Sequence, residues 1–186
     1  VICDQLQKFE GRRILRINQV GGRFVSKPEP SLTKCNDICN ASDLIINKIN
    51  CKGKFLYFEL NNGFDIINTL GMTGSWNEKL SDWDAVKFSF EAGPLFFNDI
   101  RHFGTLKYVP EKILKNKLNT LGLVPLQNKL KSQTVFNLLQ NTQTLSELLM
   151  RQDLICGIGN YLKNEILYQA KLSPWRIGKT LSIQEV

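Results

Sequence analysis

Three features that are scarce or absent in this 186-residue sequence exclude whole classes of protein. No apolar run approaches the roughly 18 residues that a membrane-spanning helix needs, and no signal-peptide pattern opens the chain. His102 is the single histidine, and Cys35 and Cys39 are not followed by a second pair of metal ligands. The sequence therefore predicts no membrane partner, and no metal site within the chain.

Cysteine is present in an odd number, at positions 3, 35, 39, 51 and 156. An odd count without a secretory signal is typical of reduced thiols in an intracellular compartment. We therefore expect ordinary thiols at all five positions.

Positive charge is in excess, with 24 Lys and Arg against 17 Asp and Glu, a net charge of +7 and a pI near 9.2. Such a balance favours an acidic partner, nucleic acid before a membrane surface. Charge alone leaves open that the protein binds nothing anionic, because many basic proteins do not.

The first half of the chain has the patterning of β-strands. Val86, Phe88 and Phe90 alternate with polar residues, as in a strand with one buried face. The turn sequence Asn61-Asn62-Gly63 predicts a hairpin. Further strands are predicted over residues 12–20, 44–51, 54–60, 64–69 and 95–98. Strands this frequent, joined by tight turns, predict an antiparallel sandwich or barrel.

The second half has the patterning of helices. The composition changes after about Tyr108, and residues 112–131 are predicted to form a polar connector. Thr144 and Glu147 have the spacing of a capping box ahead of an apolar run.

A further helix is predicted from Asn160, as its N-cap, to Ala170. Leu162, Ile166 and Leu167 would share its apolar face with Ala170.

The two ends of the chain suggest a longer protein. Apolar residues from Val1 to Phe9 have helical spacing, and Gly11 is placed to end that helix, yet no cap precedes Val1. Ser182 and Glu185 form a second capping box with only Val186 after it. We therefore expect the chain to be a fragment.

The turn Gly157-Ile158-Gly159 precedes the predicted helix at Asn160. Both glycines can take positive φ values, and the N–H groups of a helix start favour an anion, so the segment could bind a phosphate. A tight turn whose glycines only permit close packing explains the same spacing. On spacing alone both interpretations stay open.

Four motifs, in order along the chain, resemble those of the formamidopyrimidine-DNA glycosylase and endonuclease VIII family. GIGNYLKNEILYQAKLSPWR resembles the helix–two-turns–helix signature, and INTLGMTGSW the strand and void-filling loop. FNDIRHFGTL resembles the Asp-Pro-Arg-Arg-Phe-Gly segment, and CKGKFLYFEL the strand with the active-site lysine. The connector LGLVPL is also similar to the family's Leu-Gly-Pro-Asp-Pro-Leu.

This resemblance implies an α+β multidomain fold. We expect an N-terminal antiparallel β-sandwich over residues 1–110 and a linker over 111–130. A helix–two-turns–helix domain, truncated before the family's zinc finger, would follow over 131–186. The chain itself is expected to hold no cofactor, because zinc is expected only in that finger.

The resemblance assigns Met72, Arg101 and Phe103 to the trio that fills the gap left when a damaged nucleotide is turned out of the duplex. Taken singly, Met72 or Phe103 would be interpreted as core, and Arg101 as an ion-pair partner of Asp99.

Other residues are assigned by the same resemblance. Lys54 is implied to be the active-site lysine, and Lys54 and Asn160 bind phosphates near the lesion, with Gly157 and Gly159 in the turn. Glu165 is implied to support the inner face of the signature helix. A strand lysine in solvent and a carboxylate favoured by the helix dipole are the plainer interpretations of Lys54 and Glu165.

Two departures from the family pattern stand out. His102 lies where the family commonly has a second basic residue, so we interpret it as a DNA-facing or structural variant. Residues 83–85 read Trp-Asp-Ala, where many members have a DNA-contacting histidine.

The family reaction uses the secondary amine of an N-terminal proline, which attacks C1′ of the damaged nucleotide and forms a Schiff base; β,δ-elimination then cleaves the strand. The next residue, a glutamate, is the general acid and base. Aligning Gly11 and Ile14 with the family places that leader ahead of Val1. We therefore expect the 186 residues to be catalytically silent, with no covalent adduct after borohydride trapping on abasic DNA.

The predicted function of the parent protein is that of a base-excision-repair DNA glycosylase and abasic-site lyase acting on oxidised bases. We expect it to act as an intracellular, DNA-associated monomer, in nucleus, cytoplasm or viral factory, on double-stranded DNA containing oxidised bases or abasic sites. A non-catalytic damaged-DNA-binding protein of the same fold is the alternative. An unrelated RNA-binding sandwich with helices is supported by charge alone. Oxidised purine against oxidised pyrimidine stays open.

Overall fold

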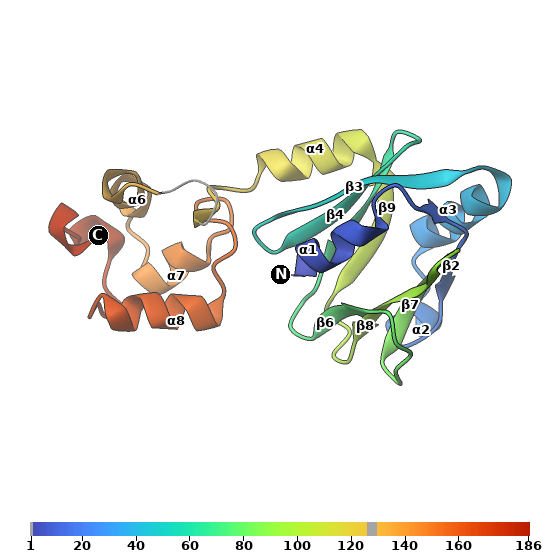
Figure 1. The fold of residues 1–186 in the computed structure, drawn as a ribbon. Coiled ribbons are helices and arrows are strands. Elements are labelled where there is room, and N and C mark those ends of the chain that lie inside the picture. The colour runs from blue at the N-terminus through green and yellow to red at the C-terminus, as the bar shows by residue number, and fades with distance from the viewer. Residues whose placement is uncertain (1, 126–129) are drawn as a thin grey trace. The chain divides into compact units, whose positions relative to one another are not determined.

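The computed structural model describes residues 2–125 and 130–186 (Figure 1). It divides into two compact units, residues 1–116 (unit 1) and residues 117–186 (unit 2). Val1, at the start of the first predicted helix, and Leu126, at the end of the LGLVPL connector, lie outside the described residues.

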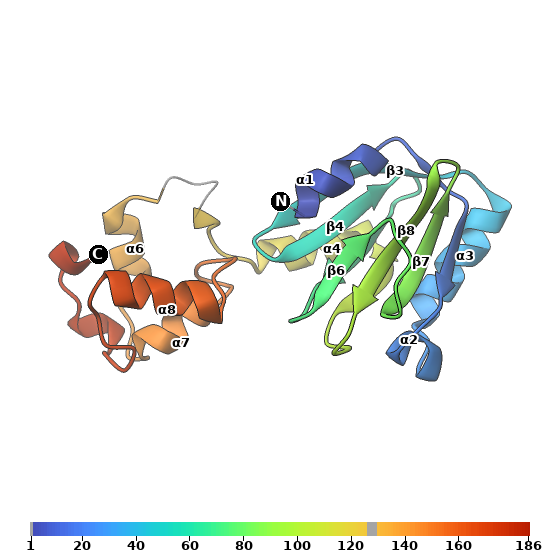
Figure 2. The ribbon, with the colours of Figure 1, turned by 60° about the horizontal axis from the view of Figure 1, so that its bottom comes forward.

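Unit 1 is a sandwich of two antiparallel sheets, as expected from the frequent strands and tight turns (Figure 2). One sheet has the order β1-β3-β4-β5-β9 and the other the order β2-β7-β8-β6. The strands are β1 (Arg13–Ile14), β2 (Arg16–Gln19), β3 (Leu44–Lys52), β4 (Phe55–Leu60), β5 (Phe64–Thr69), β6 (Gly74–Asn77), β7 (Asp84–Phe90), β8 (Gly93–Asp99) and β9 (Thr105–Pro110).

Most predicted strands are confirmed, and one is divided. The segment 12–20 is two strands, because β1 pairs with β3 in one sheet and β2 pairs with β7 in the other. The chain changes sheets at Leu15, whose N–H donates to Ser89 O at 2.8 Å. The short strands β6 and β9 were not predicted.

Aromatic side chains fill the space between the two sheets. Trp76 lies at the centre, with ring centroids 5.4 Å from Phe58, 5.4 Å from Phe88 and 5.3 Å from Phe97. Burying one large apolar side chain stabilises a fold by roughly 1.5–3 kcal/mol. The indole N–H of Trp76 donates to the buried Asn68 Oδ1 at 3.0 Å, so the aromatic core has no unpaired donor at this point.

Helices cover the sandwich of unit 1. They are α1 (Ile2–Leu6), the 3₁₀ helix η1 (Gln7–Phe9), α2 (Arg23–Ser26) and α3 (Pro30–Ala41), and α4 (Glu111–Asn119) runs from the end of unit 1 into the first residues of unit 2. Helix α1–η1 and its end at Gly11, where φ is 75°, are as predicted. Helices α3 and α4 were not predicted: α3 lies in the half of the chain whose patterning predicts strands, and α4 lies in the predicted polar connector.

The reasons for α3 and α4 are local. Pro30 is the first residue of α3, and the Glu29 side chain accepts from Ser31 N at 3.3 Å at its start. Helix α4 begins at Glu111, whose carboxylate pairs with Lys115 Nζ one turn later at 2.7 Å. Leu114 is the buried side chain of α4, and Leu118 follows it at a spacing of four, so the apolar periodicity of a helix was present in a segment that is otherwise polar.

Unit 2 is helical. Its described elements are α6 (Ser132–Leu139), α7 (Leu145–Met150), α8 (Asn160–Gln169), η2 (Gly178–Thr180) and η3 (Ile183–Glu185). Leu145, Leu148 and Leu149 of α7 pack with Leu167 of α8 in its core. The capping boxes at Thr144–Glu147 and Ser182–Glu185 are both present, as predicted. None of the helices over residues 2–125 and 130–186 is long and apolar enough to span a membrane.

Two details of the predicted helix at residue 160 are wrong. Its N-cap is Gly159, so Asn160 is the first helical residue. Leu162 and Ile166 are 43% and 36% exposed, and Ala170 is exposed too, whereas Leu167 is buried. Of the four residues predicted on the apolar face, only Leu167 is therefore buried in the core of unit 2.

Candidate nucleic-acid interface

Two loops of unit 1 lie side by side where the chain crosses between the sheets. The first, residues 70–73, runs from β5 to β6, and the second, residues 100–104, runs from β8 to β9. Their ends are paired in register, Thr69 with Thr105 in one sheet and Gly74 with Asp99 in the other. Both crossings therefore leave and enter the sandwich at the same place.

A buried carboxylate ties the two loops together. Asp99 is 1% exposed; its Oδ1 accepts from Thr73 Oγ1 at 2.9 Å, and its Oδ2 accepts from Gly104 N at 2.6 Å. The Thr73 hydroxyl in turn accepts from Arg101 N at 3.0 Å. Each loop thus supplies groups that the other needs for its own conformation.

A glycine permits the close approach of the loops. Gly71 has φ 61°, and a Cβ placed on it would lie 2.8 Å from Gly104 N. Such a contact is too short for a real side chain, so the loops can meet only because position 71 has none.

Three exposed side chains project from these loops, those of Met72, Arg101 and Phe103, and Arg101 contacts the other two. Met72 and Phe103 are 72% and 58% exposed. Arg101 Nη1 lies 3.4 Å from Met72 Sδ, and the Arg101 guanidinium carbon lies 5.2 Å from the Phe103 ring centroid. Core packing is therefore wrong for Met72 and Phe103, and Asp99 bonds to Thr73 and Gly104 rather than forming an ion pair with Arg101.

His102 stands between Arg101 and Phe103 with its side chain turned to the protein. It has φ 57°, and its imidazole lies so close to Gly22 that a Cβ there would be 2.1 Å from His102 Cε1. This left-handed residue lets Arg101 and Phe103 share one side of the loop. The contact favours the structural interpretation of His102.

Lys54 lies in the turn between β3 and β4 and is exposed. The predicted strand 54–60 thus begins one residue later, at Phe55, because Gly53, with φ 61°, and Lys54 make the reversal. A lysine in the turn extends from the end of the sheet, whereas a lysine within the strand would project from one of its faces.

In unit 2 the two glycines ahead of α8 differ in conformation. Gly157 has φ 102°, as expected for a position that needs glycine, whereas Gly159 is extended, with φ −121°. Only Gly157 thus uses the positive φ that both glycines permit. The Gln152 side chain holds the turn: its Oε1 accepts from Gly157 N at 2.9 Å and its Nε2 donates to Ile158 O at 2.8 Å.

Asn160 begins α8, where backbone N–H groups attract an anion. Its Oδ1 accepts from Lys163 Nζ at 2.7 Å, so an ammonium group shares this helix start. Lys163 was not predicted as a site residue, although its spacing of three from Asn160 on a helix is a readable signal. Glu165 is exposed and accepts from Gln169 Nε2 at 2.8 Å.

An ion pair precedes the glycine turn. Arg151 Nη2 lies 2.6 Å from Asp153 Oδ2, and Arg151 Nη1 donates to Gln143 Oε1 at 3.0 Å. The hydrogen bond from Arg151 lowers the pKa of Asp153 below its ordinary value. Asp153 therefore stays ionised, and its charge is met by Arg151.

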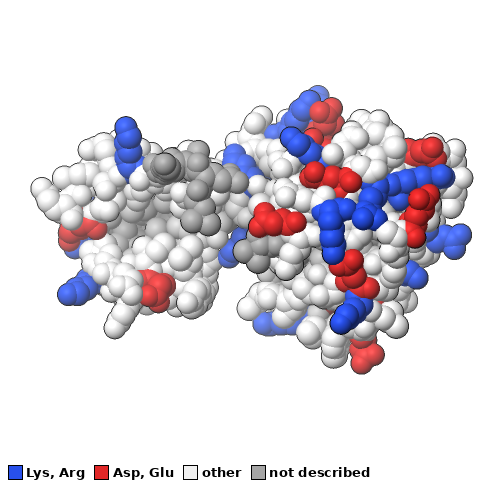
Figure 3. All heavy atoms as spheres, viewed as in Figure 1, with Lys and Arg blue, Asp and Glu red and all other residues white. Residues whose placement is uncertain are grey.

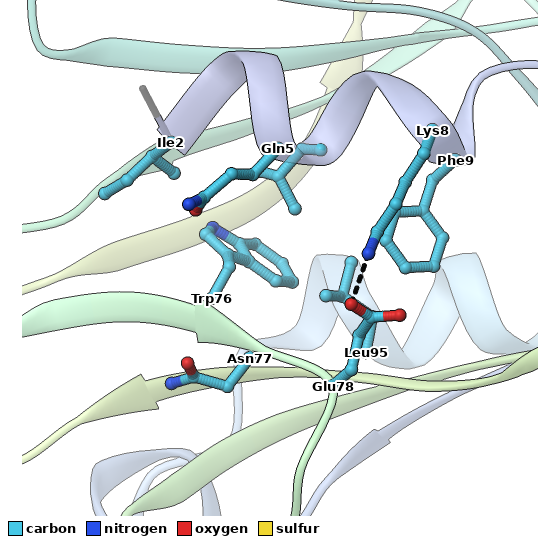
Figure 4. A pocket seen from close by; sticks show the side chains of 9 residues that line it. Ile2, Gln5, Lys8, Phe9, Trp76, Asn77, Glu78 and Leu95 are labelled. Carbon is cyan, nitrogen blue, oxygen red and sulfur yellow. Dashed lines mark hydrogen bonds and ion pairs between the residues drawn. The ribbon is translucent and has the colours of Figure 1, made fainter.

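A pocket of unit 1 lies apart from the predicted residues. It has a volume of about 280 Å³ and is lined by α1, η1, β6 and β8 residues such as Gln5, Trp76 and Leu95 (Figure 4). An ion pair between Lys8 and Glu78 crosses it. None of the predicted site residues lines this pocket.

Charges of both signs are mixed on the face of unit 1 that Figure 3 shows, where basic and acidic side chains are interspersed.

Comparison with known families decides the relationship. Residues 1–106 match the family model described as the formamidopyrimidine-DNA glycosylase N-terminal domain, and residues 121–186 match its H2TH domain. This chain belongs to the formamidopyrimidine-DNA glycosylase family.

Curated members of the family are similar over three quarters of the chain. The formamidopyrimidine-DNA glycosylase of Wolbachia pipientis is 31% identical over 148 residues, which are 76% of this chain and 55% of that protein. The enzyme of Thermus thermophilus is 32% identical over 143 residues, covering 75% of this chain and 54% of that protein. The chain thus spans about half the length of these curated relatives.

Solved structures of formamidopyrimidine-DNA glycosylases share the fold. The Lactococcus lactis protein bound non-covalently to DNA containing an abasic site has a TM-score of 0.84 at 24% identity. The match covers 99% of this chain and 71% of the Lactococcus lactis chain. The Thermus thermophilus structure has a TM-score of 0.80 at 26% identity, with 99% and 67% covered.

Proposed function

We propose that the protein is a DNA glycosylase of base excision repair that removes oxidised bases and nicks the strand as an abasic-site lyase. Its partner would be double-stranded DNA containing an oxidised base or an abasic site, met inside the cell by a monomer. Family membership supports the reaction class, and the paired loops of unit 1 support the recognition step.

One observation carries the proposal: Met72, Arg101 and Phe103 are exposed, Arg101 contacts the other two, and a buried carboxylate joins the loops that present them. Large apolar side chains that are exposed together mark a surface that binds a partner. Turning a nucleotide out of a duplex costs a few kcal/mol and leaves a gap between stacked bases. Met72 and Phe103 would fill that gap, and Arg101 would donate to the base left without its partner.

Phosphate binding is assigned to one place in each unit, to Lys54 in unit 1 and to the start of α8 in unit 2. Lys54 offers an exposed ammonium on a turn, and Asn160 and Lys163 lie beside the N–H groups of a ten-residue helix. Gly157 and Gly159 leave room for the sugar-phosphate backbone to approach that helix start. Glu165 accepts a hydrogen bond from Gln169 and would in this way fix the side chains on the exposed face of α8.

The covalent steps are part of the same proposal. An amine with a lowered pKa attacks C1′, the damaged base leaves, and the resulting Schiff base allows elimination of the phosphates. In the family this amine belongs to an N-terminal proline, assisted by the glutamate after it. The residues of this chain would hold the gap open and keep the sugar in place for that attack.

The test is fluorescence anisotropy of the 186-residue chain with two duplexes that differ only in one abasic site. We expect Arg101→Ala to lower the preference for the abasic duplex on the order of tenfold, which corresponds to about 1.4 kcal/mol. Arg12→Ala is the matched control, because Arg12 also lies over a phenylalanine, 5.6 Å from the Phe9 ring centroid. It should leave the preference unchanged.

The phosphate residues should behave differently in the same titrations. Lys54→Ala and Asn160→Ala should weaken binding to both duplexes alike, and Lys54→Ala should also reduce the salt dependence by about one phosphate contact. Lys34→Ala, on α3 beside Phe64 at the far end of β5 from Thr69, is the control for charge alone. An unchanged lesion preference in Arg101→Ala would contradict the proposed gap-filling trio.

A further inference from the structure

Two cysteines from distant parts of unit 1 meet at the edge of a sheet. Beyond its short pairing with β1, strand β3 has an edge that is covered by α1 and η1. At Ile49 this cover is direct: its N–H donates to Glu10 Oε1 at 2.8 Å, and its carbonyl accepts from Cys3 Sγ at 3.5 Å. Cys51 follows Ile49 at the spacing that puts both side chains on one face of the strand.

The two thiols are close in space. Cys3 Sγ lies 3.5 Å from the carbonyl oxygen of Ile49, two residues before Cys51, and Cys51 is among the groups that raise the pKa of Cys3. Both residues are free and partly exposed, whereas Cys35 and Cys39, one turn apart on α3, are only 0% and 2% exposed. The chain therefore contains one thiol pair that solvent reaches and one that it does not.

We propose that Cys3 and Cys51 form a reversible disulfide, a modification site at which a peroxide oxidises the pair. Their positions support this, because Cys3 Sγ bonds to the backbone of β3 two residues before Cys51. A disulfide forms only between cysteines whose backbones are already close. Partial exposure supports it too, since the oxidant must reach one sulfur.

The order of events follows from the surroundings of Cys3. Burial, and then the neighbouring Cys51, raise the pKa of Cys3 to about 12, so Cys3 is the weaker first nucleophile. The Cys51 sulfur attacks one peroxide oxygen and becomes a sulfenic acid, while the O–O bond breaks and the second oxygen leaves as hydroxide. That hydroxide removes the Cys3 proton and becomes water. The Cys3 thiolate then attacks the Cys51 sulfur, the S–S bond forms, and the sulfenic oxygen leaves as hydroxide, which takes up the proton that Cys51 gave up and becomes the second water. Two thiols are oxidised and one peroxide is reduced.

The bond would add a covalent link to a segment that is otherwise held by packing, mainly of Leu6 and Phe9 in the core. It would fasten α1 to the end of β3, directly before the Gly53–Lys54 turn. A thiol would restore the dithiol by exchange.

The experiment is to treat the folded 186-residue chain with one equivalent of hydrogen peroxide and count free thiols. We expect the count to fall from five to three. Digestion with trypsin without reductant should join VICDQLQK (residues 1–8) to INCK (residues 49–52), whereas the peptide that holds Cys35 and Cys39 together stays reduced. The unfolding midpoint should rise by about 5 °C or more, and dithiothreitol should reverse the rise.

Variants make the assignment specific. Cys3→Ser and Cys51→Ser should each abolish the loss of two thiols, and Cys35→Ser, the matched control, should still lose two. If a variant fails to fold, peptide mapping of the unaltered chain still decides. Five remaining thiols, a bond within residues 35–48, or a disulfide between two chains would overturn the proposal.

Discussion

The two units stabilise their turns by different means. In the described part of the chain, every buried polar side chain lies in unit 1: Asp65, Asn68, Asp84, Asn98 and Asp99. The side-chain hydrogen bonds of unit 2 come instead from half-buried or exposed groups nearby in sequence, such as Gln152 for the turn at Gly157. The buried polar side chains of unit 1 thus bond to distant partners, as Asn68 does to Thr105, whereas the bonds between distant segments of unit 2 are backbone bonds such as Gly178 N to Gln143 O.

The difference has an energetic side. A buried acceptor that loses its donors pays the full desolvation cost, whereas an exposed one turns to water. Asn68 illustrates the buried case, since it accepts from Trp76 of β6 and donates to Thr105 O of β9 at 2.8 Å. Substitutions in unit 1 should therefore cost more than equivalent ones in unit 2.

The largest effect is expected for Asp99→Ala. It leaves the Gly104 N–H and the Thr73 hydroxyl without their acceptor in a buried position, which we expect to cost about 3 kcal/mol of unfolding free energy. Urea unfolding measures this, and the anisotropy titrations should show a reduced preference for the abasic duplex. Asp37→Ala, at an exposed position of α3, is the control. Stability equal to that of the unaltered chain would remove the contrast between the units.

A second test concerns a buried carboxylate, Asp65, whose negative charge has few compensating partners. Asp65 is 3% exposed, and its Oδ2 has no hydrogen-bond partner among residues 2–125 and 130–186. Burial, and then the charges of Glu59 and Glu111, raise the pKa of Asp65 from 3.8 to about 6, although Lys115 opposes this shift.

The sign of the pH dependence follows from that shift. The folded state binds a proton more tightly than the unfolded state, so this group lowers stability as the pH rises from about 4 through 6. Asp65→Asn should therefore raise the unfolding free energy on the order of 2 kcal/mol at pH 7 and change it little at pH 4. Thermal unfolding of both chains from pH 4 to 8 measures the difference. A gain that is the same at every pH would contradict the assignment.

The smallest effect is expected in unit 2, for Gln152→Ala. The variant loses the bonds to Gly157 N and Ile158 O, but water can reach this half-buried turn, so we expect a loss of about 1 kcal/mol. Faster amide exchange at Gly157 should accompany it. Gln133→Ala, an exposed glutamine that bonds Asn137 on α6, is the matched control. A loss as large as that of Asp99→Ala would mean that the two units are held alike.

The same contrast explains what the sequence could predict. The capping boxes at Thr144 and Ser182 are local patterns and were confirmed. Strand β7 was predicted from its own alternation, whereas β6 has only four residues. Strand β9 alternates buried Leu106 and Tyr108 with exposed Lys107, a strand signal that was readable in the sequence but not used. Helix α3 has its buried side chains at Leu32, Cys35 and Cys39, a helical spacing that polar neighbours obscure.

The site was predictable to the extent that it resembles a family. The resemblance selected Met72, Arg101 and Phe103, and the structure brings them into contact. It gave no role to Asp99, which was considered only as a surface ion-pair partner. The partners of Asp99 include a threonine on another loop, and no local pattern connects the two residues.

The pairing of Gly74 with Asp99 has a consequence for the order of assembly. A ribosome releases β6 well before β8, and antiparallel neighbours so far apart in the chain pair late because loop closure must come first. The contact between Met72 and Arg101 therefore arises only after β6 has paired with β8. Binding of an abasic duplex during refolding should not begin before these two strands have paired.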